Sequence, residues 1–211
     1  MSIKVVSFDV DGTLVDHGFV DLFWEVGIPE LYAEKEGIPF DQAKEHVMTR
    51  YGEVGEEDIR WYLPEFWFDD LGLKGDVREL LDKFKEEVRI FPEVPEVLED
   101  LRVEYELIVL SNAAREFLGI ELEEIESYFA HIFSSTSDFN QVRKTTDFYS
   151  KICQILGIEP SDMLHVGDHP TFDYIAPKKL GIEALYMDRT GKSTGEETIK
   201  DLREVKRKLM S

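Results

Sequence analysis

The chain has 211 residues, of which 43% are apolar, so it can form one large domain or a core domain with a smaller insertion. Its formal net charge of −21 argues against nucleic acids and anionic membrane surfaces as partners. No apolar run approaches the roughly 18 residues of a membrane-spanning helix, and no signal-peptide pattern opens the chain, so we expect a cytoplasmic protein. The one cysteine, Cys153, excludes an internal disulfide framework, and scarce amide residues beside abundant Glu and Lys favour a thermophilic source.

The first predicted element is a buried strand at residues 5–8, which is short, apolar and rich in valine. Two carboxylates, Asp9 and Asp11, follow it, and Gly12 then lets the backbone turn close to a ligand. Because carboxylates are normally exposed or paired, two of them at the mouth of a buried strand indicate a functional site. In parallel α/β sheets, ligands bind outside the carboxyl ends of the strands, which is where both aspartates would lie.

Two other interpretations explain less of this stretch. A hairpin turn at Asp11 and Gly12 does not need Asp9. A calcium loop of the EF-hand type requires glycine at its sixth position and glutamate at its twelfth, where a count from Asp9 gives Leu14 and Val20. A ligand site therefore accounts best for the pair of aspartates.

The segment from residue 17 to residue 90 shows no strand-like alternation and is predicted to be helical throughout. Helices are expected at residues 20–26, 28–36, 40–50, 56–68 and 77–87, with glycines between them. A loop at residues 49–52 would bring Arg50 to a substrate phosphate or leaving group, unless this arginine is an exposed helix-end residue. We interpret the many aromatic residues mainly as the core of a helical bundle, with one or two of them as candidates for lining a substrate pocket. These aromatic residues are Phe23, Trp24, Trp61, Tyr62, Phe66, Trp67 and Phe68.

Strands return in the second half of the chain. A helix at residues 95–105 precedes a strand at residues 106–110 that ends in Ser111 and Asn112. A hydroxyl and free backbone amides at a strand end can hold a phosphoryl oxygen. A helix at residues 122–128, a strand at 131–134 and a loop at 135–142 then lead to Arg143 and Lys144. We favour Lys144 over its neighbour as the lysine of the site.

The last third repeats the pattern of an acid after an apolar strand. A helix at residues 146–156, in which Cys153 is a packing residue, precedes a strand at 164–166 that leads to Asp168. Asp173 follows at the start of the next helix, where an acid is also favoured for electrostatic reasons alone. His169 lies in the loop between them and is expected to be satisfied by a neighbour. A strand at residues 184–187 and a helix at 196–209 complete the chain.

Four of these stretches resemble, in order and over essentially the whole chain, the motifs of the haloacid dehalogenase (HAD) superfamily. They are the strand followed by Asp9-Val10-Asp11-Gly12-Thr13, the strand closed by Ser111, the lysine Lys144, and Gly167-Asp168 with Asp173. The chain departs from the third motif, because many family members place a proline after the lysine, where Thr145 stands here.

The resemblance implies an α/β fold with a Rossmann-like parallel sheet, helices on both of its faces, and an inserted all-helical cap of the C1 type. The core domain would comprise residues 1–16 and 91–211, and the cap domain residues 17–90.

The resemblance also implies a Mg²⁺-dependent phosphatase that hydrolyses a small phosphorylated metabolite, a phosphomonoester, through an aspartyl-phosphate intermediate. Asp9 would be the nucleophile. Asp11 would be the general acid and then the base, since neighbouring carboxylates raise its pKa. Ser111 and Lys144 would complete the catalytic set by orienting the phosphoryl group and neutralising its charge.

The binding residues implied by the resemblance fall into two groups. A hard cation such as Mg²⁺ takes oxygen ligands, here the carboxylates of Asp9 and Asp168 and the backbone carbonyl of Asp11. Asp173 would support the loop or a metal-bound water from behind. The substrate would be bound by Thr13, Ser111, Asn112 and Lys144.

Four alternatives remain beside the phosphatase. A 2-haloacid dehalogenase resembles this chain in fold and nucleophile but uses neither the second aspartate nor magnesium, so Asp11 favours phosphoryl transfer. A phosphomutase would share all the core residues. A receiver-like phospho-accepting module also groups acids, a hydroxyl and a lysine around Mg²⁺, but its acceptor follows the third strand and it lacks a helical cap. A binding protein without turnover is the fourth.

Overall fold

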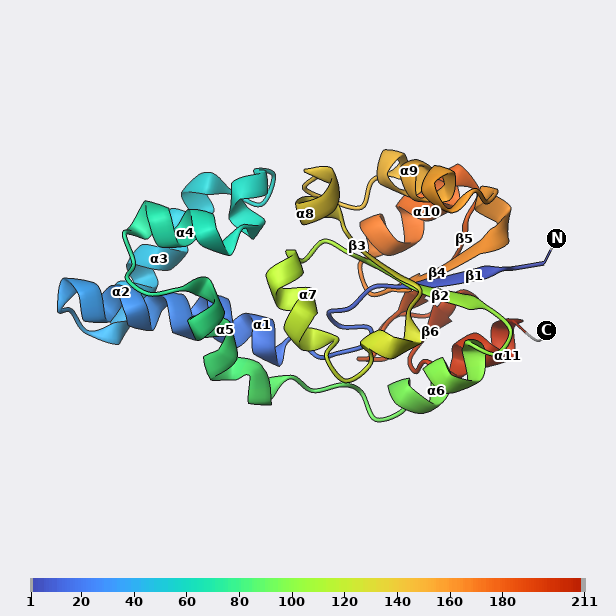
Figure 1. Cartoon of the computed structure of the whole chain (residues 1–211), viewed down its shortest axis with the longest axis horizontal. Coiled ribbons are helices and arrows are strands. Elements are labelled where there is room, and N and C mark those ends of the chain that lie inside the picture. The colour runs from blue at the N-terminus through green and yellow to red at the C-terminus, as the bar shows by residue number, and fades with distance from the viewer. Residues whose placement is uncertain (1, 210–211) are drawn as a thin grey trace.

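Six parallel strands form the centre of the protein, which is described over residues 2–209 by a computed structural model. In the order in which they lie side by side, the strands are β3, β2, β1, β4, β5 and β6 (Figure 1). Their bounds are β1 Val5–Phe8, β2 Glu106–Ser111, β3 His131–Ser134, β4 Met163–Gly167, β5 Glu183–Met187 and β6 Thr198–Ile199. The predicted fold class is confirmed: a parallel sheet with crossover helices.

The register of the sheet aligns the carboxyl ends of its central strands. Phe8 at the end of β1 lies opposite Val109 of β2 and Val166 of β4. Because all three strands run in the same direction, the residues that follow them emerge at one edge of the sheet. This edge carries the candidate site.

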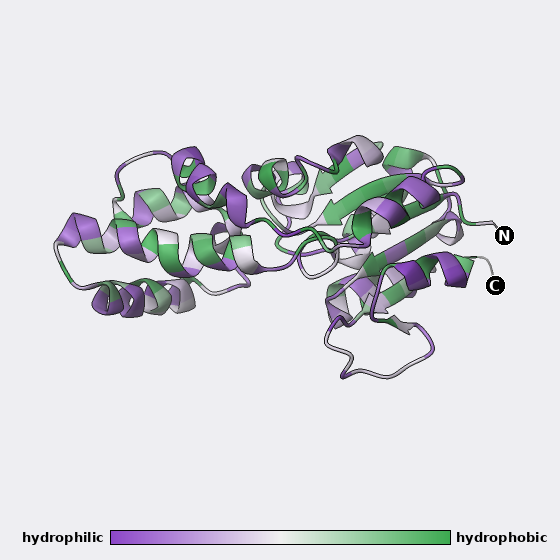
Figure 2. Cartoon of the chain, turned by 90° about the horizontal axis from the view of Figure 1, so that it is seen from below, coloured by the Kyte–Doolittle hydropathy of each residue, from purple (hydrophilic) through white to green (hydrophobic). Residues whose placement is uncertain are grey.

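Helices cover both faces of the sheet, as the near-continuous burial of its strands requires. On one face, Val6 and Phe8 of β1 pack in a cluster with helix α6 (Val94–Leu101) and helix α11 (Arg203–Leu209). On the other face, Val5 packs in a cluster with helix α9 (Thr146–Leu156) and helix α10 (Ala176–Leu180). The strands are mostly hydrophobic between these two helical layers (Figure 2).

Residues 18–87 contain helices and no strand, and we call them the helical insertion. Its α-helices are α1 Gly18–Leu22, α2 Ile28–Glu36, α3 Phe40–Val54, α4 Pro64–Leu71 and α5 Val77–Phe84. The insertion has its own core, which contains Phe19, Phe23 and Trp67, and it extends away from the sheet on the side of the strand ends (Figure 1). Its helical character agrees with the predicted cap, while the domain limits at residues 16 and 91 stay a prediction.

The insertion contacts the rest of the protein through helix α7 (Arg115–Glu121), which follows β2. Ala114, Phe117 and Ile120 of this region belong to the hydrophobic core of the insertion. The two connecting segments also bind each other: Val15 and Ile90 form an antiparallel bridge, and the Asp16 amide donates to the Arg89 carbonyl at 3.0 Å. The insertion is thus attached by a paired two-segment connection and by one shared helix.

Several predicted elements were wrong. The helix expected at residues 122–128 lies earlier, as α7, whose Phe117 and Leu118 are buried, and only a short 3-10 helix at Glu126–Tyr128 falls within the predicted range. The loop expected at residues 135–142 begins with helix α8 (Ser135–Phe139), whose first turn is capped when the Ser134 hydroxyl accepts from the Ser137 amide.

The expected terminal helix at residues 196–209 begins only at α11, because β6 precedes it. Ile199 is fully buried and pairs with Met187 of β5, so tertiary burial decides against the local helical pattern. By contrast, the expected strands at residues 5–8 and 131–134 and the helix at 146–156 are confirmed.

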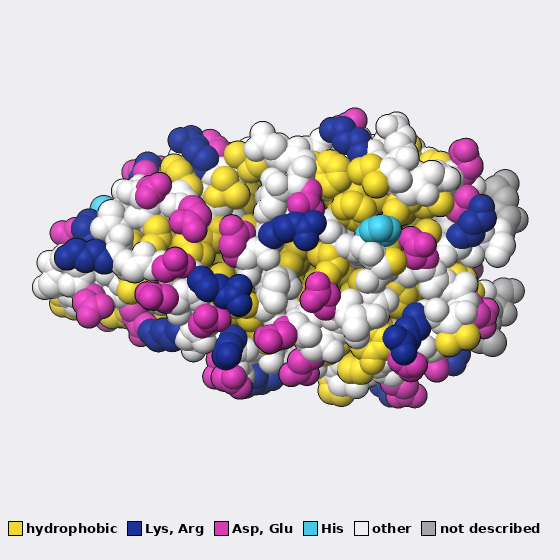
Figure 3. Space-filling model, in the orientation of Figure 1, with side chains coloured by type: hydrophobic (Ala, Val, Ile, Leu, Met, Phe, Trp, Pro, Cys, Tyr) yellow, Lys and Arg dark blue, Asp and Glu magenta, His cyan; other side chains and the backbone are white. Residues whose placement is uncertain are grey.

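Two surface properties complete the description. On the face shown in Figure 3, basic side chains are dispersed among acidic ones and form no continuous patch. Within residues 2–209, none of the helices combines the length and the apolar character needed to cross a bilayer.

Candidate active site

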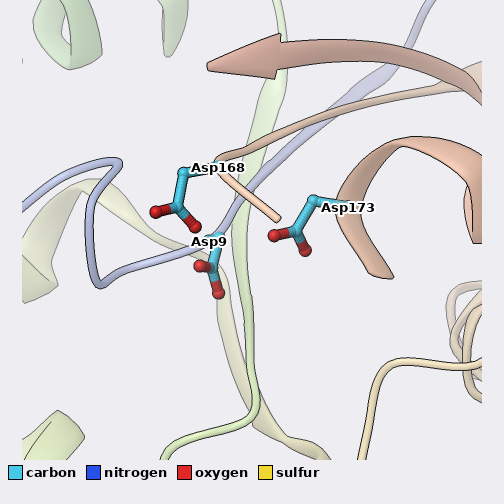
Figure 4. Close-up of side chains that lie close together, drawn as sticks. All are labelled: Asp9, Asp168 and Asp173. Carbon is cyan, nitrogen blue, oxygen red and sulfur yellow. The ribbon is translucent and has the colours of Figure 1, made fainter. Parts of the chain in front are cut away.

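Three aspartates meet at the carboxyl ends of β1 and β4 (Figure 4). Asp9 follows β1, Asp168 follows β4, and Asp173 lies on the π-helical turn Pro170–Ile175. One carboxylate oxygen of each lies within 4.8 Å of the others. The sequence predicted this convergence because parallel strands deliver their following residues to one edge.

Lys144 is the cation at the centre of this group. It is only 1% exposed, and its ammonium donates to a carboxylate oxygen of Asp9, to Asp173 Oδ1 at 2.6 Å and to the Leu110 carbonyl at 2.9 Å. Burial alone would lower the pKa of Lys144, but Asp173 and Asp9 hold it above its ordinary value, so the ammonium stays charged. Arg143 instead lies over the Phe172 ring at 4.9 Å, so the structure places Lys144, and not its neighbour, against Asp9.

Asp173 is held by bonds to both of its oxygens. The Oδ2 atom accepts from the His169 amide at 2.9 Å, and Oδ1 lies 3.1 Å from His165 Nε2. Ser7 Oγ lies 2.8 Å from the other ring nitrogen of His165. Burial alone would raise the pKa of Asp173, but Lys144 and His165 hold it below its usual range. This aspartate therefore fixes the lysine and the loop.

Two glycines are required by this packing. Gly12 has φ +71°, and a Cβ there would lie 2.1 Å from Asp168 Oδ2. A Cβ on Gly167 would lie 2.5 Å from Asp173 Cγ. Both positions let the backbone approach the carboxylates more closely than any other residue would allow.

Asp9 and Asp11 have different surroundings. Burial raises the pKa of Asp9 well above its ordinary value, and the ammonium of Lys144 acts against this shift. Burial also raises the pKa of Asp11, and a hydrogen bond with Glu121 of α7 acts against it. Asp11 therefore shares a buried pocket with another acid, whereas Asp9 contacts a cation.

Glu121 is the residue that the sequence interpretation missed. It is 1% exposed, and burial beside Asp11 raises its pKa well above the ordinary value. Neither carboxylate oxygen of Glu121 has a hydrogen-bond donor among the described residues, and a bond between two carboxyl groups requires a proton on one of them. A signal was present, because Glu121 stands three and four residues after Leu118 and Phe117 on a buried helix face.

His17 is a second missed neighbour of the site. Its Nε2 atom lies 3.5 Å from Asp168 Oδ2, and this hydrogen bond raises its pKa to about 9 against the opposing effect of burial. The imidazolium partly balances the charge of Asp168. His17 directly precedes helix α1, so this contact ties the start of the insertion to the strand edge.

The predicted phosphate-binding residues differ in their hydrogen bonds and in their position relative to the site. The Ser111 hydroxyl accepts from the Ala113 amide at 3.0 Å, and Asn112 Oδ1 accepts from the Lys144 amide at 2.9 Å. Both residues therefore shape the loop after β2. Thr13 is completely buried, its hydroxyl has no hydrogen-bond partner among the described residues, and it does not line the cavity described next.

A cavity of about 320 Å³ opens between the insertion and the strand edge, and we call it the cap-side cavity. Asp11 and Asn112 lie at its catalytic end, and the insertion supplies most of its walls. Arg50 does not line it: residues 49–52 lie inside α3 and not in a loop, and Arg50 pairs with Asp70 at 2.8 Å. The cavity is lined by Asp11, Val20, Asp21, Trp24, Glu25, Met48, Tyr51, Trp61, Tyr62, Asn112, Ala113, Ala114 and Phe117.

The acidic cluster fits a hard divalent cation. Asp173 is committed to Lys144, His165 and the His169 amide, which leaves Asp9 and Asp168 as the carboxylates able to ligate. An all-oxygen donor set of this kind suits Mg²⁺ better than softer metals.

Comparisons with known proteins agree with this geometry. Residues 3–181 match the family described as haloacid dehalogenase-like hydrolase. The GMP/IMP nucleotidase YrfG of Escherichia coli is 25% identical over 169 residues, which are 79% of this chain and 74% of that protein. The phosphoglycolate phosphatase of Vibrio parahaemolyticus is 26% identical over 205 residues, covering 85% of this chain and 81% of that one.

A solved structure supports the same fold. The HAD phosphatase from Thermococcus onnurineus superimposes with a TM-score of 0.84 at 24% identity, over 98% of each chain. The family match extends from before β1 to beyond Asp173 and so includes every strand end that carries the site. The chain therefore belongs to the haloacid dehalogenase-like hydrolase family.

Proposed function

We propose that this hydrolase is a Mg²⁺-dependent phosphatase that cleaves a small phosphomonoester through a phosphorylated Asp9. The observation that carries the proposal is the buried contact of Lys144 with Asp9, at a strand edge where Asp11 lines a cavity. The names of two relatives, a GMP/IMP nucleotidase and a phosphoglycolate phosphatase, support a small phosphomonoester as the substrate class.

Asp9 and Asp168 would hold the cation through their carboxylates, and the Asp11 backbone carbonyl would add a third oxygen. When bound, Mg²⁺ neutralises negative charge on the phosphoryl oxygens. Lys144, which is bonded to Asp9, supplies further positive charge, and the loop after β2, with Ser111 and Asn112, orients the phosphoryl group.

In the first step, a carboxylate oxygen of Asp9 attacks phosphorus, and the bond from phosphorus to the leaving oxygen breaks. Asp11 gives its proton to that oxygen, so an alcohol leaves instead of an alkoxide. The raised pKa of Asp11 suits this role, because a carboxyl that keeps its proton near neutral pH can act as a general acid.

In the second step, Asp11 takes a proton from a water molecule, and that water attacks the phosphorus of the aspartyl phosphate. The bond between phosphorus and Asp9 breaks, which releases inorganic phosphate and regenerates both side chains. The helical insertion acts as the cap that the sequence predicts for residues 17–90, and it limits access of bulk water to the site during this cycle.

Asp11 also distinguishes the phosphatase from a 2-haloacid dehalogenase, which the sequence left as an alternative. A halide leaves without a proton, so an acid beside the leaving group has no task in dehalogenation. The proximity of Asp11 to the cavity and its raised pKa favour phosphate esters.

The test is a panel of phosphomonoesters and 2-haloacids assayed with Mg²⁺ and in excess chelator. We expect phosphatase turnover that chelation abolishes and Mg²⁺ restores. The Asp168→Asn variant should need a higher Mg²⁺ concentration for half-maximal rate, whereas Asp69→Asn, at an exposed position of helix α4, should not. Dehalogenation that persists in chelator, with no phosphatase turnover, would refute the proposal.

A further inference from the structure

The cap-side cavity receives the leaving group of the substrate. This step rests on the proposed function, in which Asp11 protonates the leaving oxygen. That oxygen must then lie beside Asp11, and the remainder of the alcohol extends from there into the cavity that Asp11 lines. At about 320 Å³, the cavity is at the small end of the range for small-molecule sites.

Aromatic rings form most of the apolar wall of this cavity. Trp24 lies 5.9 Å from the Tyr51 ring and 5.5 Å from the Phe117 ring, and Trp61 packs edge-on against Tyr62 at 4.9 Å. Tyr51 and Phe117 are buried and hold the wall in place, whereas Trp24, Trp61 and Tyr62 keep partly exposed faces. A flat apolar ligand can therefore stack on rings that are already ordered.

Hydrogen bonds fix two of the wall segments. The Tyr51 hydroxyl donates to the Trp24 carbonyl at 3.3 Å, and the Trp67 indole donates to the Trp61 carbonyl at 3.0 Å. These bonds hold the backbone at Trp24 and at Trp61, and ring contacts with Tyr51, Phe117 and Tyr62 position the two indoles.

The charged residues of the cavity are all acidic. Besides Asp11 they are Asp21 and Glu25, one helical turn apart, and no Lys, Arg or His of residues 2–209 lines the space. Glu25 pairs with Lys44 at 3.1 Å, whereas Asp21 has no ion-pair partner in the part of the chain that the structure describes. Lys44 beside Glu25 and His17 near Asp21 offset part of this negative charge from outside the cavity. A second anionic group on the leaving alcohol would still meet carboxylates and no basic side chain among the described lining residues, which is unfavourable.

The nearest arginine does not change this balance. Arg143 lies beside Tyr62 at the edge of the cavity, but its guanidinium pairs with Glu57 at 2.7 Å and Glu56 at 3.4 Å. Its charge is already matched by these two carboxylates.

We propose that the cap-side cavity selects phosphomonoesters whose leaving alcohol has a flat, apolar body and carries no second negative charge. The aromatic wall recognises the body, and Asp21 with Glu25 rejects alcohols that bear a carboxylate or a further phosphate.

Four esters with primary alkoxide leaving groups separate these two features. Benzyl and ethyl phosphate differ by the aromatic ring, and 4-carboxybenzyl and 4-carbamoylbenzyl phosphate have the same shape but differ by one charge. With Mg²⁺ present, we expect kcat/KM for benzyl phosphate to exceed that for ethyl phosphate about tenfold or more. We expect the carboxybenzyl ester to be worse than its amide by about tenfold.

Matched variants assign these preferences to the cavity. Trp61→Leu should lower the benzyl-to-ethyl ratio of kcat/KM, whereas Phe66→Leu, which changes an aromatic residue outside the cavity, should keep it. Asp21→Asn should raise the ratio of the carboxybenzyl to the carbamoylbenzyl ester, and Asp69→Asn, at an exposed carboxylate outside the cavity, should not.

The outcomes separate this inference from the proposed function. Turnover of none of the four esters would overturn both. Turnover of all four with similar kcat/KM would overturn the inference and leave the phosphatase intact. Ratios that differ as expected in the wild type but stay unchanged in Trp61→Leu and Asp21→Asn would place the selectivity elsewhere, and would also overturn it.

Discussion

Asp9 and Asp11 are two positions apart but lie in environments that suit opposite tasks. Burial raises the pKa of both carboxyl groups, so the direction of the shift does not separate them. Their contacts do: Asp9 is bonded to the buried ammonium of Lys144, which opposes the shift and favours the carboxylate form needed for attack. Asp11 instead lies beside the buried acid Glu121 and lines the cap-side cavity, where a leaving group would need a proton.

Exchanging each aspartate for asparagine should separate these roles. Asp11→Asn keeps the nucleophile, and an aryl phosphate needs little help from an acid, because its leaving group is a stable anion. The variant should give a burst near one equivalent of p-nitrophenol, followed by hydrolysis slowed about 10²–10⁴-fold. Trapped phosphate should map to Asp9. The control Asp9→Asn should show no burst, and a burst from it would contradict the assignment.

Glu121 should tune the pH at which Asp11 works. The hydrogen bond with Glu121 lowers the pKa of Asp11, so its loss in Glu121→Leu should raise that pKa further. Hydrolysis of the aspartyl phosphate needs Asp11 as a deprotonated base, and its acidic limb should therefore move to higher pH. Glu121→Gln keeps a neutral donor and should leave the limb near its wild-type position. The measurement is the pH profile of dephosphorylation. Equal profiles for Glu121→Leu and Glu121→Gln would mean that Glu121 serves only to pack against its neighbours and does not tune the pKa of Asp11.

At the level of elements, the helix of residues 18–36 shows how packing overrides a local signal. Gly27 was expected to separate two helices, but α1, the π-helical turn Phe23–Gly27 and α2 are continuous. A Cβ on Gly27 would lie 2.8 Å from the Phe84 ring and 2.9 Å from Leu80. The glycine thus permits close contact with α5 and does not end the helix.

Two glycine-to-alanine variants test this explanation. Gly27→Ala should lower the free energy of unfolding by about 1 kcal/mol or more, since Phe84 and Leu80 are buried and would have to move. Gly52→Ala, in the exposed part of α3 with nothing within 4 Å, should raise it by about 0.5–1 kcal/mol. Urea denaturation of both variants measures the difference. Stabilisation of similar size in both would show that Gly27 has no packing role.

At the level of the whole molecule, the insertion and the sheet domain meet around the cap-side cavity. Phe117 of α7 lies in the insertion core, and Arg143, just before α9, pairs with Glu57 in the insertion. The two connecting segments, by contrast, pair through a single antiparallel bridge between Val15 and Ile90. Contacts around the cavity therefore add to the paired connection in holding the two parts in this arrangement.

Removing the contact between Arg143 and Glu57 should weaken the docking of the insertion against the sheet domain. The acidic partners are exposed, so the pair contributes about 0.2–1 kcal/mol, and Arg143→Gln should lower kcat/KM by up to about fivefold. Added salt should reduce the difference between the variant and the wild type, because it screens the pair. Arg78→Gln, whose partner Asp82 lies within the insertion, should behave like the wild type. An Arg143→Gln effect that is independent of salt would indicate that its stacking on Phe172 matters instead.

Much of the site could be predicted because its signals are local. Asp9, Asp11, Ser111 and Asp168 each follow a short apolar strand, and a parallel sheet brings such strand ends to one edge. Lys144 was selected over Arg143 by resemblance to a motif, and the structure places it against Asp9. The helical character of residues 18–87 was likewise evident from the absence of strand alternation.

The sequence by itself thus determined the fold class, the helical nature of the insertion and the edge of the sheet at which the acids gather. Only the tertiary structure decided the partners of those acids, since Glu121 reaches Asp11 and His165 reaches Asp173 through contacts that no local pattern encodes. It also decided that β6 is a strand and that Trp24 and Trp61 line a cavity while they pack against the core of the insertion. The physical reason is the same in each case. Burial and pairing depend on which segments meet in space, and the local sequence around an aromatic or acidic residue does not indicate which distant residue it will contact.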